Sequence, residues 1–173
     1  MAQEWHRRTY AGVALPVRYY AGEIRDSDPA FPELSGYEVI VGSARGLPSA
    51  DVPLGLVAFE AGMHAMTRLL DSRVPVGTRP TTAVDLRAIL LAAAIAHGEW
   101  IRIHPFANGN GRSGRLWANW VAVRYSLPVF ASLMPRPAGL LYAGAAAASM
   151  RGDHDPMATV LHDMLRVALT GSP

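Results

Sequence analysis

Apolar residues recur at steps of three and four along several stretches of this chain. One such series follows Pro53 and comprises Leu56, Phe59, Met63, Met66 and Leu70. This spacing places its members on one face of an α-helix, so the series predicts a helix with a single buried stripe. Methionines in such a stripe are typical of a hydrophobic core.

A second helix is predicted to begin at Thr82, because Thr82 and Asp85 have the spacing of a capping box. Pro105 disfavours helical geometry at the residue before it. His104 should therefore lie where this helix gives way to a loop, within reach of other molecules. The apolar core candidates of the helix are Leu86, Ile89, Leu90, Ala93, Ala94 and Ile101.

Three more helices and one strand are predicted. The helix over residues 112–125 has a broad apolar surface and is stopped by Pro128, an alanine-rich helix covers residues 137–150, and an amphipathic one covers residues 156–169. Residues 37–41 are β-prone and bounded by glycines, which indicates one strand of a hairpin. The predicted fold is mainly α, a helical bundle with a short β-hairpin. The apolar residues of the helix over 112–125 are Leu116, Trp117, Trp120, Val121 and Val123.

The chain has 173 residues, half of them hydrophobic, which is enough for one domain with a sizeable core. We assign residues 35–173 to this domain. Residues 1–34 contain three prolines and are predicted to form an irregular arm packed on it. Cysteine is absent, which excludes a disulfide framework, thiol catalysis and cysteine-ligated metals.

All sixteen positively charged residues are arginine, yet the net charge is only +2 and no dense basic run occurs. We therefore expect no nucleic-acid partner. The first residues, MAQEWHRRTY, lack the apolar segment of a secretion signal, and no apolar run has the length of a membrane span. The sequence predicts a cytoplasmic protein with no membrane partner.

Residues 104–115 read HPFANGNGRSGR and carry the most specific chemistry. Gly109 and Gly111 can adopt backbone angles closed to other residues, so the amides around Asn110 are expected to point inward as an anion-binding nest at the start of a helix. Arg112 and Arg115 are three residues apart and share a helix face, which lets both guanidinium groups reach phosphates held there.

This segment resembles the signature of the Fic family, HxFx[D/E]GNGRxxR. The later segments RLWANW and RGDHDP, and the earlier GYEVIVGSARGLPSADVP, are also similar to family patterns. The resemblance covers roughly residues 35–168 and implies a Fic-type helical bundle with a hairpin flap beside the active-site loop. The motif positions that match are His104, Phe106, Gly109, Asn110, Gly111, Arg112 and Arg115.

The resemblance implies a protein adenylyltransferase that transfers AMP from ATP to a Ser, Thr or Tyr hydroxyl of a target protein. His104 is then the general base and Phe106 packs beneath the loop. The catalytic set is His104, Asn110, Arg112 and Arg115. Phosphates are bound by Gly109, Asn110, Gly111, Arg112 and Arg115. The flap that positions the target by backbone pairing comprises Gly36, Tyr37, Glu38, Val39, Ile40 and Val41.

Asn108 departs from the pattern, which has an acid here that holds magnesium. A neutral amide oxygen is a weaker ligand for a hard cation, so weaker Mg²⁺ binding or a shift toward Mn²⁺ is expected. Two alternatives stay open: a transferase using another phosphodiester donor, such as UTP or CDP-choline, and a catalytically impaired nucleotide-binding or interaction module.

The remaining histidines lack zinc-ligand spacing and are interpreted as surface or cap residues. The inhibitory pattern [S/T]xxxE[G/N] of many Fic proteins has no match, the nearest pair being Ser149 and Asp153. Inhibition, if it occurs, is therefore expected from a separate antitoxin-like chain; alternatively, the altered Asn108 makes restraint unnecessary. These histidines are His6, His64, His97, His154 and His162.

Overall fold

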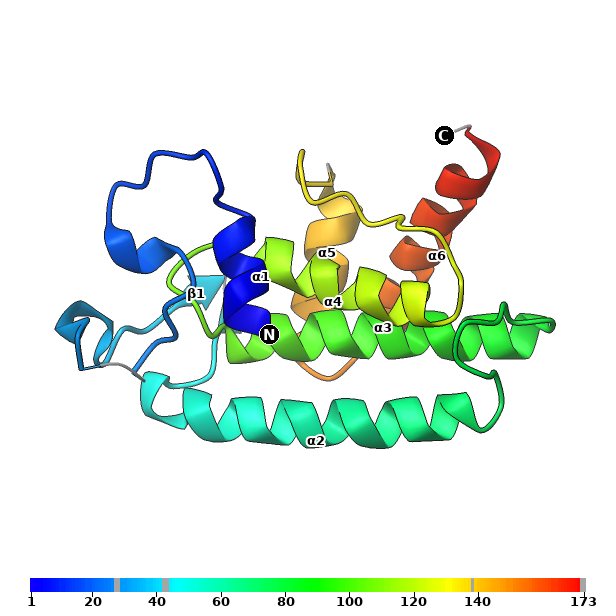
Figure 1. Ribbon diagram of the computed structural model, residues 1–173, viewed down its shortest axis with the longest axis horizontal. Coiled ribbons are helices and arrows are strands. Elements are labelled where there is room, and N and C mark those ends of the chain that lie inside the picture. Colours follow the sequence, from blue (N-terminus) through cyan, green and yellow to red (C-terminus); the bar gives the residue numbers. More distant parts are fainter. Residues whose placement is uncertain (27–28, 42–43, 138, 172–173) are drawn as a thin grey trace.

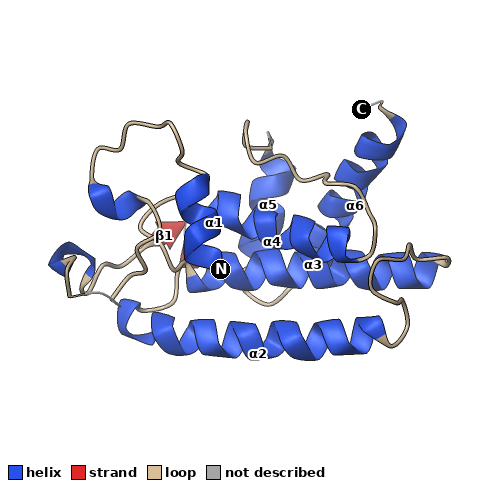
Figure 2. Cartoon of the chain, in the orientation of Figure 1, coloured by secondary structure: helices blue, strands red, loops and turns tan. Residues whose placement is uncertain are grey.

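The computed structural model describes residues 1–26, 29–41, 44–137 and 139–171. Helices dominate the chain, and the predicted mainly helical class is confirmed (Figures 1 and 2). No helix among the described residues combines the length and apolar character needed to cross a membrane. The helices are α1 (Ala2–Arg8), α2 (Val52–Asp71), α3 (Ala83–Ile103), α4 (Asn110–Arg124), α5 (Leu140–Ser149) and α6 (Asp155–Thr170).

Helix α3 is the centre of the bundle, because α2, α4, α5 and α6 all pack against it. Figure 1 shows α2 and α3 as two long helices lying side by side, with α4 returning along α3 after the loop at residues 104–109. Contact on several sides explains why apolar and small residues continue around α3. Ala93, Ala94 and Ala96 are fully buried, and their small side chains let neighbouring helices approach closely.

An aromatic cluster joins four elements beneath the loop at 104–109. Trp117 of α4 lies 5.1 Å from Trp5 of α1, 5.1 Å from Phe59 of α2 and 5.6 Å from Trp100 of α3, measured between ring centroids. Phe106 of the loop completes the cluster, 5.9 Å from Trp100. Large aromatic side chains bury much apolar area, so this cluster fixes the N-terminal helix and the loop to the same core.

The apolar stripe predicted for α2 and the capping residue predicted for α3 are confirmed. In α2 the buried residues Phe59, Met63 and Leu70 belong to the predicted stripe. At the start of α3, the Thr82 hydroxyl accepts a hydrogen bond from the Asp85 amide at 3.1 Å and donates one to the Asp85 carboxylate at 2.7 Å. The hydroxyl thus caps one of the amides that a helix start leaves without a partner.

Two later helices differ from prediction at their starts. Helix α4 begins at Asn110, two residues earlier than predicted, because Gly109 takes a left-handed conformation (φ 79°) and serves as its N-cap. Helix α5 begins at Leu140 instead of residue 137, after Gly139 with φ 102°. The broad apolar surface expected on α4 also narrows at its end, since Val123 is 54% exposed.

The β-structure is shorter than predicted. Among the described residues, β1 (Ile40–Val41) and β2 (Ala44–Arg45) pair as an antiparallel hairpin, with Ile40 opposite Arg45 and Val41 opposite Ala44. One isolated antiparallel bridge joins Ile24 to Phe106. Gly42 and Ser43 lie outside the described residues. The Gly46 amide extends the pairing by donating to the Val39 carbonyl at 3.0 Å, and the Leu47 amide donates to the Arg102 carbonyl at 2.8 Å. The hairpin is therefore tied to the C-terminal end of α3.

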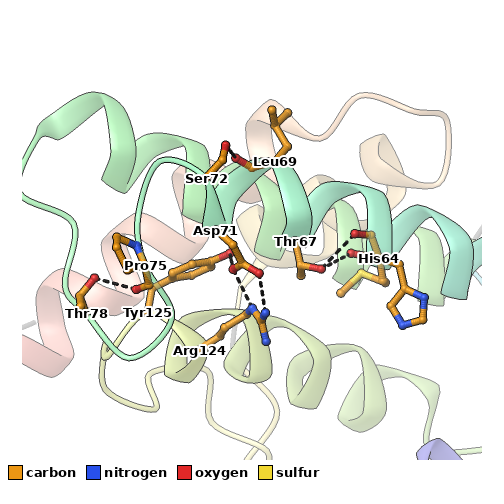
Figure 3. A network of polar contacts seen from close by, with 10 residues as sticks. His64, Thr67, Leu69, Asp71, Ser72, Pro75, Thr78, Arg124 and Tyr125 are labelled. Atoms are coloured by element: carbon orange, nitrogen blue, oxygen red, sulfur yellow. Dashed lines mark hydrogen bonds and ion pairs between the residues drawn. The ribbon is translucent and has the colours of Figure 1, made fainter.

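A polar network fastens the end of α2 to the end of α4 (Figure 3). The Arg124 guanidinium donates to both carboxylate oxygens of Asp71, at 3.0 and 2.6 Å, and the Tyr125 hydroxyl donates to the same carboxylate at 2.9 Å. The hydrogen bond from Arg124 keeps the pKa of Asp71 below its ordinary value, and burial raises the pKa of Tyr125 to about 12.

Replacing Asp71 with alanine should lower the free energy of unfolding by about 1–3 kcal/mol, because it leaves the buried Tyr125 hydroxyl and a half-buried guanidinium without their acceptor. Denaturant unfolding followed by circular dichroism measures the change. Ser72→Ala is the matched control, since the exposed Ser72 hydroxyl donates only to the Leu69 carbonyl one turn back. Equal unfolding midpoints for the two variants would contradict a stabilising role of the network.

Candidate active site

A cavity of about 850 Å³ lies between the hairpin, the C-terminal half of α3 and the first turns of α4 and of α5. Tyr37, Glu38, Val39 and Ile40 line it on the hairpin side, whereas Gly36 does not, and the side chain of Val41 lies outside the described part of the chain. The structure therefore brings four of the six predicted flap residues together with the loop. The lining also includes the predicted residues His104, Asn108, Gly109, Asn110, Gly111, Arg112 and Arg115.

His104 ends α3 in a left-handed backbone conformation, with φ 52° and ψ 56°. This conformation is strained for a residue with a Cβ, and such strain is commonly held at functional sites. The ring nitrogen Nδ1 lies 3.1 Å from the Ile101 carbonyl, which can only accept, so Nδ1 carries the proton. Nε2 is left with its lone pair. Burial lowers the pKa of His104 to about 4, which keeps the ring neutral at pH 7.

Arg25 holds the backbone of His104 in place. Its side chain is completely buried, and within the described residues its guanidinium donates to backbone carbonyls at the end of α3 and in the hairpin segment. The end of a helix carries partial negative charge, which favours a cation there. The carbonyls are those of His104 at 2.8 Å, Ile103 at 3.0 Å, Tyr37 at 2.6 Å and Leu47 at 2.9 Å.

The loop after His104 is closed by Asn110. The side-chain oxygen of Asn110 accepts from the Phe106 amide at 3.0 Å, and its nitrogen donates to the Phe106 carbonyl at 2.7 Å. Asn110 is buried, so its side chain braces the loop. Any contribution of Asn110 to phosphate binding then comes from its backbone N–H.

The start of α4 presents N–H groups to the cavity. Gly109 caps the helix without a side-chain hydrogen bond, and the amides of Asn110 and Gly111 have no acceptor within the described residues. The prediction of unusual backbone angles at both motif glycines is wrong for one of them. Gly109 has a positive φ, whereas the backbone of Gly111 is helical. A Cβ on Gly109 would lie 2.6 Å from His6 Nε2 and 2.8 Å from the Tyr10 hydroxyl, so space as well as backbone angle requires glycine there.

The cavity is positively charged. The Arg115 guanidinium is buried, and its acceptors in the described part of the chain are neutral oxygens: the Ser132 carbonyl at 2.7 Å, the Leu133 carbonyl at 3.0 Å and the Tyr142 hydroxyl at 3.1 Å. Arg112 packs on the Tyr10 ring, 4.0 Å from guanidinium carbon to ring centroid. A buried cation without a carboxylate partner is costly unless an anion approaches it, so this site suits an anionic ligand.

A family model described as Fic/DOC family matches residues 1–122, more than two thirds of the chain. The chain belongs to the Fic/DOC family. A Fido domain-containing protein of Dictyostelium discoideum is 46% identical over 50 residues, which are 29% of this chain and 33% of that protein. The chain thus spans about a third of the length of the curated relative it matches.

The Fic/DOC match begins at residue 1 and so includes the N-terminal arm. The arm contributes His6, whose ring stacks on Phe106 at 3.7 Å between centroids. His6 Nδ1 accepts from the Gly22 amide at 2.8 Å, and the opposite nitrogen, Nε2, donates to the Asn108 carbonyl at 2.8 Å. Both bonds require the neutral ring, and burial lowers the pKa of His6 to about 4.

The interpretation of the other histidines is wrong for two of them. His6 and His97 are fully buried, and only His64, His154 and His162 are exposed or at a helix cap. Their burial depends on partners far along the chain: His6 meets the loop of the Fic motif, and His97 Nε2 lies 2.8 Å from the Tyr142 hydroxyl. Helix α3 is unbroken, which places His97 and His104 along the same cavity.

Position 108, where the Fic motif usually has an acid, offers a poor metal ligand in this chain. Asn108 is exposed, and its side-chain oxygen accepts from the Gly109 amide at 2.6 Å. No group of three or more His, Cys, Asp or Glu residues in the described part of the chain is arranged to hold a metal. Position 108 would thus offer a magnesium ion one neutral, already engaged oxygen.

Replacing Arg25 with methionine should lower the free energy of unfolding by at least about 3 kcal/mol, because it leaves four buried carbonyls without their charged donor. Chemical denaturation measures this loss. Arg45→Met removes an exposed arginine of the same hairpin and is the control, with a change expected within about 0.5 kcal/mol. A loss no larger for Arg25→Met than for Arg45→Met would refute the bracing role.

Lowering the pH should destabilise the fold through its buried histidines. The pKa of His6 is about 4 and that of His97 about 3 in the folded chain, whereas an unfolded histidine has a pKa near 6.5. Between these values the unfolded chain binds more protons, so the free energy of unfolding falls as the pH drops from 6.5 toward 4, by roughly 1 kcal/mol per pH unit for each histidine.

Urea unfolding at several pH values tests this dependence. His6→Gln should flatten it, whereas His64→Gln, which removes an exposed histidine, should leave it unchanged. An identical slope in wild type and His6→Gln would show that His6 is not held neutral by the fold.

Proposed function

We propose that this protein is a nucleotidyltransferase that moves AMP from ATP to a Ser, Thr or Tyr hydroxyl of a protein target. The observation that carries the proposal is the combination in one cavity of a neutral histidine, acceptor-free helix amides and arginines without carboxylate partners. The cavity volume of about 850 Å³ is suited to a nucleoside triphosphate. The family's transferase character supports the same reaction class.

The proposed reaction is a displacement at the α-phosphorus of ATP. The target hydroxyl oxygen forms a bond to phosphorus while the bond to the bridging oxygen of the β-phosphate breaks, and pyrophosphate leaves. His104 Nε2 takes the hydroxyl proton. This nitrogen is free to accept because the hydrogen bond from Nδ1–H to the Ile101 carbonyl fixes the tautomer. The amides of Asn110 and Gly111 and the guanidinium groups of Arg112 and Arg115 stabilise the charge that builds on the phosphates.

The hairpin is proposed to position the target. Ile40 is 63% exposed and lies in β1, and residues 37–40 line the cavity that His104 also lines. An extended target segment could add to this strand by backbone hydrogen bonds, which places a hydroxyl side chain near His104 without dependence on the target sequence. Arg25 joins the hairpin and His104 through one side chain, so both would keep their relative position.

Magnesium or manganese is the predicted metal, but the ligands of this chain fit it poorly. The exposed, engaged amide oxygen of Asn108 predicts weak binding of either cation. A bound divalent cation would neutralise phosphate charge. Positioning and proton transfer are assigned to the amides, the arginines and His104.

The decisive experiment uses purified protein, cell lysate and ATP labelled in the α-phosphate, with γ-labelled ATP as a second donor and with magnesium or manganese added separately. Wild type should label a protein band from the α-phosphate only, and His104→Ala should reduce that label at least about 100-fold, because it removes the base. The exposed His64 supplies the matched control, His64→Ala, which should retain full labelling. Label that survives in His104→Ala would refute the mechanism.

Asn108→Asp separates the alternatives in the same assay. Label in this variant but none in wild type would identify a nucleotide-binding module disabled at its metal position. Equal, metal-independent label in both would show that position 108 carries no metal function. If no variant is labelled from ATP but label is transferred from UTP or CDP-choline, ATP is not the donor. The proposed transferase activity would then stand with a different donor.

A further inference from the structure

The end of the cavity formed by α5 and the segment before it consists of residues outside the Fic motif. Met134, Arg136 and Tyr142 line it there, next to the buried Arg115. The Tyr142 hydroxyl, itself buried, accepts from Arg115 and contacts His97. The Arg136 guanidinium carbon lies 6.0 Å from the centroid of the same Tyr142 ring. One aromatic side chain thus lies against two guanidinium groups.

The charges of this end are not balanced by the protein. Arg136 has no carboxylate partner among the described residues, and Arg115 donates only to neutral oxygens. Glu38 is the single carboxylate in the described lining, and it accepts from the Ser49 amide on the hairpin side. Two guanidinium groups on one wall repel each other unless an anion lies between them.

We propose that Arg136 is a third polyphosphate-binding arginine, which together with Arg115 holds the pyrophosphate that departs from the donor. The proposal rests on the function proposed above and names the residue that recognises the leaving group. The Arg136 guanidinium lies over the Tyr142 ring and lines the cavity, and a cation over a ring face retains its N–H donors for a ligand.

Asn108 gives this arginine a specific purpose. An acidic side chain with a divalent cation contributes a net charge of +1 beside the phosphates, and a neutral asparagine without a tightly held cation contributes none. Arg136 supplies one positive charge to the same cavity. The third arginine therefore offsets the charge lost at position 108 and reduces the dependence of donor binding on metal.

Binding of pyrophosphate to the full chain in metal-free buffer with EDTA tests this directly by isothermal titration calorimetry. Arg136→Gln should weaken binding about tenfold or more, because a charge-assisted contact is lost. Arg151→Gln removes an exposed arginine that lines no described pocket and should change affinity less than twofold. Arg136 is exposed, so both variants should keep the thermal midpoint of wild type.

The outcomes separate the inference from the proposed function. If wild type binds pyrophosphate and Arg136→Gln binds it as well as Arg151→Gln does, the role of Arg136 is refuted and the proposed function stands. If wild type binds neither pyrophosphate nor ATP, the proposed function fails.

A second arm tests the charge argument. In an Asn108→Asp background with magnesium, Arg136→Gln should weaken ATP binding less than about threefold, because the metal then supplies the charge. If Arg136→Gln weakens ATP binding as much in this background as in the otherwise wild-type chain, Arg136 does not offset the missing acid.

Discussion

The site depends on one buried cation. The Arg25 guanidinium satisfies carbonyls at the end of α3 and in the hairpin segment, and the Arg25 amide donates to the Pro105 carbonyl at 2.8 Å. Without the Arg25 guanidinium, the left-handed backbone of His104 and the hairpin segment would both lose their charged hydrogen-bond donor. The N-terminal arm adds a second hold on the loop through His6, which binds the Asn108 carbonyl and stacks on Phe106. The loop of the Fic motif is thus held by segments that lie far from it in the sequence.

Charge and burial are arranged so that the protein leaves part of the cavity for an anion. The guanidinium groups of the cavity are engaged with neutral carbonyls, hydroxyls and aromatic faces, which orient them without cancelling their charge. His104 is neutral for a related reason: burial, with a further contribution from the nearby Arg25, disfavours its protonated form. A neutral base beside unneutralised arginines is what transfer of a nucleotidyl group to a hydroxyl requires.

Local patterns predicted the elements and much of the lining. The stripe of α2, the Thr82 cap and the position of His104 at a helix end depend on neighbouring residues, and seven of the site residues predicted from the motif at 104–115 line the cavity. Residues whose roles depend on distant partners were missed. His6 meets Asn108 across 102 positions and Arg25 meets His104 across 79, and an arginine in a proline-containing arm gives no sign of burial. Arg136 and Tyr142 lie outside the motif, so only the fold brings them to it.

The most direct measurement of the central claim is a two-dimensional amide NMR titration of the protein with a non-hydrolysable ATP analogue. We expect chemical-shift changes concentrated at the amides of Gly109, Asn110, Gly111 and Arg112, with His104 also affected. Residues of α6 such as Thr159 and His162 should be unaffected. Saturable shifts confined to residues away from the first turn of α4, or no shifts at millimolar nucleotide, would contradict a polyphosphate site beside His104.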